Sequence, residues 1–323
     1  MIITQTPLRI SFLGGNTDFR EYYLNYGGLV LTTTIDKYIY CIVKKRFDDL
    51  IYVNYSEKEI VEKVDDLKHN LVREALKLLG ITKGIEITFL ADIPTQGTGL
   101  GSSSSVTVGV LNALHVYLGE NVSSKQLADE AIKIELDILG KPIGIQDQHI
   151  VAVGGLRAIE FQTSGNVFVQ KIEMDESTKE DFNNSLMLLY TGITRKADNV
   201  LSSFNVADNK PLLDQNKVLV NDGVVALLRG DLKRFGQLLN IYWETKKQLS
   251  DKISNPQIDA MYDLAKEAGA IGGKIIGAGG GGFLFIMFPA NKRSKVRKAL
   301  QDYKELLFRF SNSGSKVIFN MQK

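Results

Sequence analysis

The amino-acid sequence predicts an α+β protein built of two packed domains. Its 323 residues correspond to about two domains of roughly 150 residues each. Hydrophobic residues make up 44% of the chain and charged residues 24%, as in globular proteins that bury a large core. Strand-like and helix-like patterns are mixed along the chain, which favours α+β architecture. The composition does not shift at any point, and we place the predicted domains at residues 1–184 and 185–323.

The first half of the chain is rich in expected strands. Alternating or short apolar runs predict strands at residues 8–13, 29–31, 35–43, 51–53, 85–90 and 167–172. Apolar residues at helical spacing, each run ended by a nearby glycine, predict helices at residues 67–79, at 106–117 and from Ser123 or Ser124 to about 139. Residues 144–161 are punctuated by glycines and partly strand-like.

The second half alternates helices with strands. Strands are expected at residues 186–190, 283–288 and 317–319. Helices are expected at residues 218–228, 232–249 and 292–304, and in a segment of about 13 residues that Pro256 opens and that ends near Gly269.

Charge and cysteine content exclude several classes of protein. Lysine and arginine number 39 and aspartate and glutamate 37, so the net charge of +2 offers no broad field for nucleic acid or a membrane surface. The single cysteine, Cys41, lies in an apolar run and is expected to be buried. No basic stretch followed by an apolar core begins the chain, and no apolar run approaches roughly 20 residues. We expect a cytoplasmic protein whose partner is a small molecule.

The most informative segment is the glycine- and serine-rich stretch at residues 94–105, which directly precedes a predicted helix. Glycines let the backbone approach an anion, and the N-terminus of the helix adds partial positive charge. The stretch is neither a Walker A loop nor a dinucleotide fingerprint. It favours a phosphate cradle over an ordinary turn between a strand and a helix. The candidate residues are Gly97, Thr98, Gly99, Leu100, Gly101, Ser102, Ser103 and Ser104.

A second glycine cluster occupies residues 277–282, with five glycines in six positions before an apolar strand. A turn needs one or two glycines, and each further one adds conformational entropy to the unfolded chain. Close approach of the backbone to a ligand, at Gly279 and Gly280 among others, is therefore the favoured interpretation. Lys274 precedes the cluster either as a group of the site or as a solvated strand end.

Two acidic residues are candidates for chemistry. Asp147 lies in a polar stretch and is either a turn residue or a carboxylate that faces an acceptor hydroxyl. Glu135 shares a predicted helix face with apolar residues, so it either reaches water at the edge of that face or has a partner or a metal. His149 is interpreted as a structural histidine.

Basic and polar residues near two predicted strands complete the candidates. Arg9 lies within the first strand, either as an ordinary strand residue or as part of a site. Asn16, Thr17 and Asp18 follow that strand and would ordinarily form a turn. Arg195 follows the strand at 186–190, where it either binds an anionic group of a substrate or lies on the surface.

Three of these segments, residues 7–19, 94–105 and 274–282, together resemble the three motifs of the GHMP kinases, in the same order. Within the family, the chain is most similar to the branch that phosphorylates heptose 7-phosphates. Residues 7–12, 14–18, 34–38 and 99–105 carry that closer match, and residues 144–148 and 190–195 support it. Galactokinases carry Gly-Glu-His-Thr-Asp at the first motif, whereas this chain has Gly-Gly-Asn-Thr-Asp at residues 14–18, which argues against galactose. The resemblance implies a ribosomal-protein-S5-like N-terminal domain and a ferredoxin-like C-terminal domain, with a cleft between them.

The resemblance also implies roles for the candidate residues. ATP phosphates would lie on residues 97–105, with Mg²⁺ at Ser103 and Glu135. Asp147 would face the acceptor hydroxyl, Arg9 would offset charge there, and Asp18 with its two preceding residues would bind sugar hydroxyls. Arg195 and Lys37 are the candidates for holding a distal phosphate, because a phosphorylated substrate needs a cationic pocket.

The expected reaction is transfer of phosphate from ATP to the anomeric hydroxyl of a heptose 7-phosphate. The alternatives are a kinase of another sugar, such as L-fucose, and a catalytically silent protein that senses sugars. A third alternative, an ATP-dependent decarboxylase, is weakened by the similarity to sugar kinases.

Overall fold

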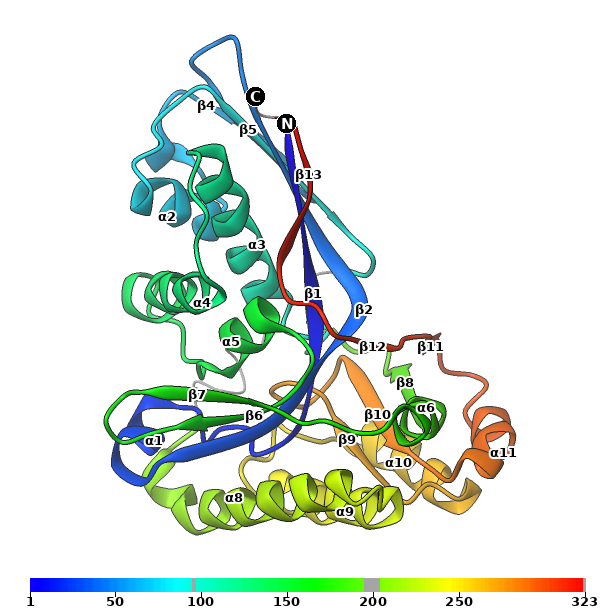
Figure 1. Ribbon diagram of the computed structural model, residues 1–323. Coiled ribbons are helices and arrows are strands. Elements are labelled where there is room, and N and C mark those ends of the chain that lie inside the picture. Colours follow the sequence, from blue (N-terminus) through cyan, green and yellow to red (C-terminus); the bar gives the residue numbers. More distant parts are fainter. Residues whose placement is uncertain (95–96, 195–203, 322–323) are drawn as a thin grey trace.

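The computed structural model describes residues 1–94, 97–194 and 204–321, which form two β-sheets with helices packed on them (Figure 1). The first sheet has nine strands, with the order β13-β1-β2-β5-β3-β4 and with β6, β7 and β12 joined beside β2. Its strands are β1 (Ile2–Leu13), β2 (Gly28–Lys45), β3 (Ile51–Asn54), β4 (Lys58–Val61), β5 (Ile85–Ala91), β6 (Leu156–Phe161), β7 (Val167–Lys171), β12 (Phe310–Ser311) and β13 (Lys316–Asn320).

Helices cover one face of this sheet, with α3 at the centre, packed on β1 and β2 (Figure 1). A side chain at Gly109 of α3 would place its Cβ 2.8 Å from Thr6 Oγ1, so the helix and β1 approach closely there. The helices of this part, with two short 3₁₀ or π turns, are α1 (Arg20–Tyr26), η1 (Val64–Asp66), α2 (Asn70–Leu78), α3 (Ser102–Tyr117), α4 (Ser124–Ile132), η2 (Lys133–Ile138), α5 (Gln146–Val153) and α6 (Glu176–Asn184).

The second sheet has four antiparallel strands in the order β11-β8-β10-β9, and the residues of its central strand β10 are all buried. Two long helices, α8 and α9, lie side by side along the bottom of Figure 1. The elements are β8 (Leu186–Tyr190), α8 (Val206–Leu228), α9 (Leu232–Lys247), α10 (Pro256–Ala268), β9 (Gly272–Ile275), β10 (Phe283–Met287), η3 (Ala290–Lys292), α11 (Arg293–Ala299) and β11 (Glu305–Leu306).

An aromatic cluster joins the two sheets. The ring of Phe12, at the end of β1, packs on Phe285 of β10 and Phe235 of α9, with centroids 5.4 and 5.6 Å apart. Phe182 of α6 contacts both Phe12 and Phe235. These rings are fully buried, so they fix the end of β1 that leads into the polar turn at residues 14–18.

The structure confirms most of the expected strands and corrects several helices. Residues 29–31 and 35–43 belong to a single long strand, β2, and the helix expected at 292–304 ends at Ala299. The helices α1, α5 and α6 were not expected. After the second sheet the chain returns to the first sheet through β12 and β13. The predicted boundary at residue 184 therefore assigns these two strands to another domain than the sheet that they join. The boundary itself stays a prediction.

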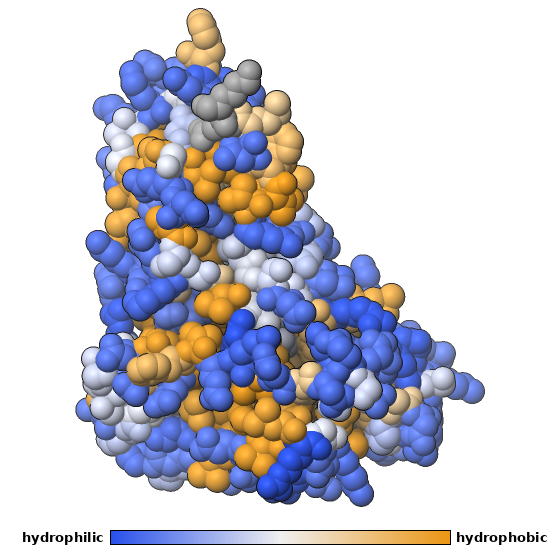
Figure 2. Space-filling model, in the orientation of Figure 1, coloured by the Kyte–Doolittle hydropathy of each residue, from blue (hydrophilic) through white to orange (hydrophobic). Residues whose placement is uncertain are grey.

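The surface is mainly hydrophilic on the face that Figure 2 shows, with separate apolar patches. Of the helices in the described part of the chain, none is long and apolar enough to cross a membrane.

Candidate active site

The two glycine-rich segments pack directly against each other. A Cβ at Gly99 would lie 2.3 Å from the carbonyl oxygen of Ile276, and one at Gly277 would lie 2.7 Å from the Cα of Gly99. Gly282 would meet the carbonyl oxygen of Thr98 in the same way, at 2.5 Å. All three glycines have positive φ angles. At Gly277 and Gly282 glycine is therefore required because the second cluster packs on the first loop. This requirement holds whether or not the backbone also approaches a ligand.

A cleft of about 970 Å³ opens beside these loops. Its volume is at the upper end of the range for small-molecule sites, about 300–1,000 Å³. Most of the candidate residues line it, although they come from distant parts of the chain. They are Arg9, Asn16, Asp18, Gly97, Thr98, Gly99, Gly101, Ser102, Ser103, Ser104, Asp147 and Gly279.

The cleft contains a bidentate pair of Arg9 and Asp147. Arg9 Nε and Nη2 each donate to a carboxylate oxygen of Asp147 at 2.6 Å, and Nη1 donates to the carbonyl oxygen of Gly99 at 2.5 Å. The sequence suggested a loop at Asp147, but the residue lies in the first turn of α5. Its side chain is 22% exposed and that of Arg9 7%, so the carboxylate reaches the cleft while the arginine fixes its orientation.

Asp18 is the second carboxylate of the cleft and is 2% exposed. Its oxygens accept hydrogen bonds from the backbone N–H groups of Asn16 and Gln146, each at 3.1 Å. A Cβ at Gly144 would lie 1.9 Å from Asp18 Oδ2, which explains the glycine at that position. Burial, with a smaller contribution from the charge of Asp147, raises the pKa of Asp18 to about 6.

This raised pKa predicts a pH-dependent stability difference for Asp18→Asn. Between pH 4 and 6 the folded protein holds a proton on Asp18 that the unfolded chain releases, so wild-type stability falls as the pH rises. The free energy of unfolding of the variant, relative to wild type, should therefore increase by about 2 kcal/mol from pH 4 to pH 7. Urea unfolding of both proteins across this range measures the difference. A constant difference would show that Asp18 ionises normally in the folded protein.

Glu135 is fully buried in the π-helical turn η2, where the expected continuous helix is interrupted. Ser103 and Ser104, in the first turn of α3, donate hydrogen bonds to its two carboxylate oxygens. Lys141 Nζ lies 3.1 Å from Glu135 Oε1 and 2.7 Å from Ser103 Oγ, and Gln148 Nε2 donates to Oε2 at 2.5 Å. The Glu135 carboxylate therefore has hydrogen-bond partners inside the protein and does not reach water at the edge of its helix face.

The Ser103 hydroxyl and the Glu135 carboxylate are the kind of hard oxygen ligands that Mg²⁺ prefers. Within the described ranges no three histidine, cysteine or acidic side chains gather as a metal site. Magnesium at this position would therefore take its remaining ligands from water and from nucleotide phosphates, which is usual for this ion. The oxygen atoms present fit such a site, in which the ion would replace the Lys141 ammonium that contacts both Ser103 and Glu135 in this structure.

Lys274 is buried at the base of the cleft and is not a solvated strand end. Its ammonium donates to the carbonyl oxygens of Ser11 at 2.7 Å and Phe12 at 3.1 Å, and lies 4.6 Å from the centre of the Tyr242 ring. Burial, together with the charges of Lys246 and Arg9, holds the pKa of Lys274 well below its ordinary value. The lysine ties β9 of the second sheet to β1 of the first.

Several candidate residues take structural places instead. Thr17 is buried and donates to the carbonyl oxygens of Gly14 and Leu29, which closes the turn after β1. Leu100 is buried, and its carbonyl oxygen accepts the N–H of Arg9. The N–H of Gly280 donates to the carbonyl oxygen of Ile253 at 2.6 Å. None of these three residues lines the cleft, and a ligand contact for them stays a prediction.

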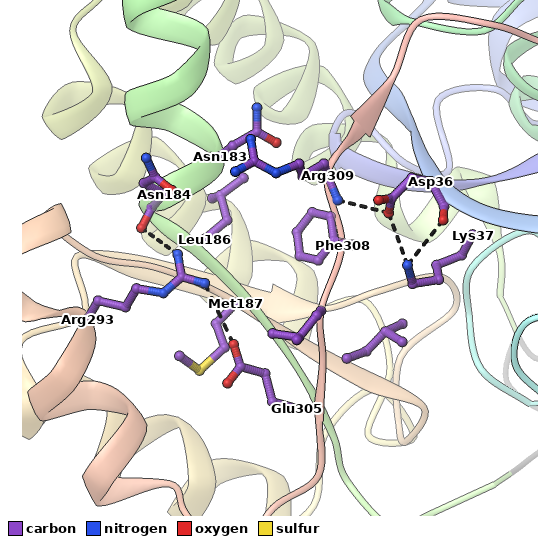
Figure 3. A pocket seen from close by; sticks show the side chains of 12 residues that line it. Asp36, Lys37, Asn183, Asn184, Leu186, Met187, Arg293, Glu305, Phe308 and Arg309 are labelled. Atoms are coloured by element: carbon purple, nitrogen blue, oxygen red, sulfur yellow. Dashed lines mark hydrogen bonds and ion pairs between the residues drawn. The ribbon is translucent and has the colours of Figure 1, made fainter.

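Lys37 lies outside the cleft, which corrects its proposed role. It lines a separate pocket of about 330 Å³, where its ammonium contacts Asp36 (Figure 3). The pairing of β1 with β2 shifts register after Pro7, so that Leu8 pairs with Ile35 whereas Pro7 pairs with Tyr38. The intervening residues face this second pocket. Arg195 lies outside the described residues.

Two residues interpreted as structural are confirmed as buried. Burial raises the pKa of the Cys41 thiol and lowers that of His149 to about 4, and neither residue lines the cleft.

Sequence reasoning missed several residues of the cleft, among them Ser11, Lys141, Gln146 and Tyr242. Gln146 could have been found as the immediate neighbour of Asp147. Lys141 had no signal, because it is six residues from Glu135 and helical spacing relates residues three or four apart.

Comparisons with known proteins identify sequences and structures that are similar to this chain. The profile described as "GHMP kinases N terminal domain" matches residues 70–155, and "GHMP kinases C terminal" matches residues 224–306. A D-glycero-alpha-D-manno-heptose 7-phosphate kinase from Campylobacter jejuni is 32% identical over 98% of both chains. An L-fucokinase/L-fucose-1-P guanylyltransferase from Bacteroides fragilis is 27% identical over 92% of this chain and 36% of its own length.

Solved structures support the same fold. A D-glycero-D-manno-heptose 1-phosphate kinase from Bacteroides thetaiotaomicron superposes with a TM-score of 0.83, at 25% identity, over the whole of both chains. A putative sugar kinase from Campylobacter jejuni has a TM-score of 0.79 at 29% identity and covers 98% of this chain and 97% of its own. The predicted two-domain α+β fold is confirmed.

Proposed function

Because this chain belongs to the GHMP kinase family and is a sugar-phosphate kinase, we propose that its substrate is D-glycero-D-manno-heptose 7-phosphate. The phosphoryl group of ATP would pass to the anomeric hydroxyl, which gives the 1,7-bisphosphate and ADP. The observation that carries the proposal is the pair of Arg9 and Asp147 in the cleft, directly beside the glycine-rich loop and the first turn of α3. The Campylobacter relative supports the choice of sugar.

The glycine-rich loop and α3 are arranged to hold nucleotide phosphates. Gly97, Gly99 and Gly101 have positive φ angles, and α3 begins directly after them, at Ser102. Its free N–H groups and the partial positive charge of the helix end favour an anion. Mg²⁺ held by Ser103 and Glu135 would neutralise negative charge on the phosphates. Phosphoryl transfer depends mainly on such positioning and charge neutralisation.

In this proposal Asp147 orients the acceptor hydroxyl and accepts its proton while the hydroxyl oxygen bonds to the terminal phosphorus and ADP leaves. Arg9 holds both carboxylate oxygens, so it fixes the direction in which Asp147 presents them. Asp18, ionised above its pKa of about 6, is a hydrogen-bond acceptor for other sugar hydroxyls.

The test of this function is an ADP-release assay with Mg²⁺ over a panel of sugars. The proposal predicts turnover on D-glycero-D-manno-heptose 7-phosphate, and a product phosphorylated at C1 by ³¹P NMR. Much faster turnover on the unphosphorylated heptose or on L-fucose would assign the protein to the kinases of free sugars. Binding without ADP release would identify a silent sugar-sensing protein.

Arg195 remains the predicted holder of the distal phosphate. Loss of one charged hydrogen-bonded contact costs about 1.5–3 kcal/mol, or about 10- to 100-fold. Arg195→Ala should therefore raise KM for the sugar phosphate by that factor and leave KM for ATP unchanged. Lys37→Ala is the matched control, because Lys37 lies in the other pocket, and it should leave both constants unchanged. An unaltered KM for the sugar phosphate in Arg195→Ala would exclude this role.

A further inference from the structure

Two side-chain atoms of residues in the cleft wall are buried without a hydrogen-bond partner. They are Oε1 of Gln146 and Oγ of Ser11. Leaving a buried polar group unsatisfied costs about 1–3 kcal/mol, so such groups are rare in folded proteins and require an explanation. Because both residues line the cleft, a small rotation of the side chain when a ligand binds would bring such an atom to a polar group of that ligand, which explains its lack of a partner here.

The side chain of Gln146 is fixed from its nitrogen end. Gln146 is the first residue of α5, and its backbone N–H donates to Asp18 Oδ2 at 3.1 Å. Its side-chain amide also hydrogen-bonds Asp18, where it lowers the pKa against the larger effect of burial. Because the amide nitrogen is engaged in this way, the oxygen is the group of this side chain that is left to accept a hydrogen bond from a ligand.

The surroundings of this oxygen determine what it can bind. Gln146 lies between Asp18, its hydrogen-bond partner, and Asp147, its neighbour in the chain. The Asp147 carboxylate is paired with Arg9, so the acceptors next to the Gln146 oxygen are led by the Asp18 carboxylate, and together they suit a ligand group that donates. A sugar hydroxyl has the required chemistry. Ser11 differs, because it lies on the cationic side of the cleft, where its carbonyl oxygen binds Lys274.

We propose that Gln146 determines sugar specificity by accepting a hydrogen bond from one hydroxyl of the substrate other than the hydroxyl that is phosphorylated. This inference rests on the proposed function of the cleft as a sugar-phosphate kinase site. A site built to hydrogen-bond a hydroxyl discriminates strongly against an analogue that lacks it, because the buried protein group is then left unpaired. Gln146 acts through binding and does not take part in proton transfer.

The experiment compares wild type with Gln146→Met, which keeps the length of the side chain and removes its oxygen. The substrates are D-glycero-D-manno-heptose 7-phosphate and analogues that each lack one hydroxyl, at C2, C3, C4 or C6. The wild type should lose at least about 100-fold in kcat/KM on one of the analogues. Gln146→Met should lose about 10- to 100-fold on the full substrate, mainly through KM, and should treat that substrate and that analogue nearly alike.

The control variant is Gln170→Met, which makes the same chemical change on exposed β7 and should retain the wild-type preference. Wild-type discrimination against every analogue in a folded Gln146→Met protein would overturn the proposal. If Gln146→Met does not fold, Gln146→Leu provides the same comparison.

The experiment also separates this inference from the proposed function. If wild type prefers another sugar, the assignment of heptose 7-phosphate fails, and deoxy analogues of the preferred sugar then test Gln146 in the same way. If no sugar is phosphorylated, both proposals are overturned.

Discussion

Replacing Asp147 by asparagine should lower kcat about 100- to 10,000-fold, the usual effect of removing a general base, while the dissociation constant for ATP stays unchanged. The amide has nearly the shape of the carboxylate but cannot accept the proton of the acceptor hydroxyl. Asparagine also presents one acceptor atom to Arg9, which in the wild type donates to two carboxylate oxygens at 2.6 Å. The effect should therefore fall on the chemical step. Single-turnover kinetics with saturating ATP and sugar phosphate measure it.

A matched control exists on the surface of the protein. Arg46 and Asp48 form another bidentate pair, with both contacts at 2.7 Å and a carboxylate that is 38% exposed, against 22% for Asp147. Asp48→Asn removes the same kind of pair outside the cleft and should leave kcat unchanged. Turnover close to that of wild type in Asp147→Asn would refute the role given to Asp147, and weakened ATP binding would indicate a displaced glycine loop instead.

Replacing Glu135 by glutamine should reduce both stability and activity. The wild-type carboxylate accepts hydrogen bonds from Ser103, Ser104, Lys141 and Gln148, and the amide would turn one of its two acceptor atoms into a donor facing donors. Breaking a buried charge pair typically costs about 3–5 kcal/mol, and partial exposure of Lys141 places this case at the lower end. Urea unfolding without nucleotide should show a loss of about 3 kcal/mol.

The same variant tests the magnesium site. Because the substitution removes a charged ligand, the Mg²⁺ concentration needed for half-maximal rate should rise at least about tenfold. Glu244→Gln is the control, because Glu244 pairs with Lys247 at the surface and such pairs contribute about 0–1 kcal/mol. Wild-type stability together with an unaltered Mg²⁺ requirement in Glu135→Gln would show that Glu135 is not a magnesium ligand.

Much of this fold could be predicted because its signals are local. The strands alternate or are continuously apolar, and the glycine loops are read directly from composition. Residues 146–153 were not recognised as a helix because α5 is buried on nearly all sides, so polar Gln148 and His149 lie in the interior among apolar residues. A helix buried in this way has no amphipathic period to detect.

The contacts of the site could not be predicted from sequence spacing. Arg9 and Asp147 are 138 residues apart, and only the packing of α5 on β1 brings them together. The misplacement of Lys37 has a similar cause, since one shift of register between β1 and β2 directs it to another pocket. Resemblance to a family supplied the roles of the residues, and the structure supplied their partners.

The most direct test of the account is a crystal structure with a non-hydrolysable ATP analogue, Mg²⁺ and D-glycero-D-manno-heptose 7-phosphate. We expect the terminal phosphate against residues 97–104 and the anomeric hydroxyl within hydrogen-bond distance, about 3 Å, of Asp147. A nucleotide bound elsewhere, for example in the pocket of Figure 3, or an anomeric hydroxyl directed away from Asp147, would contradict it.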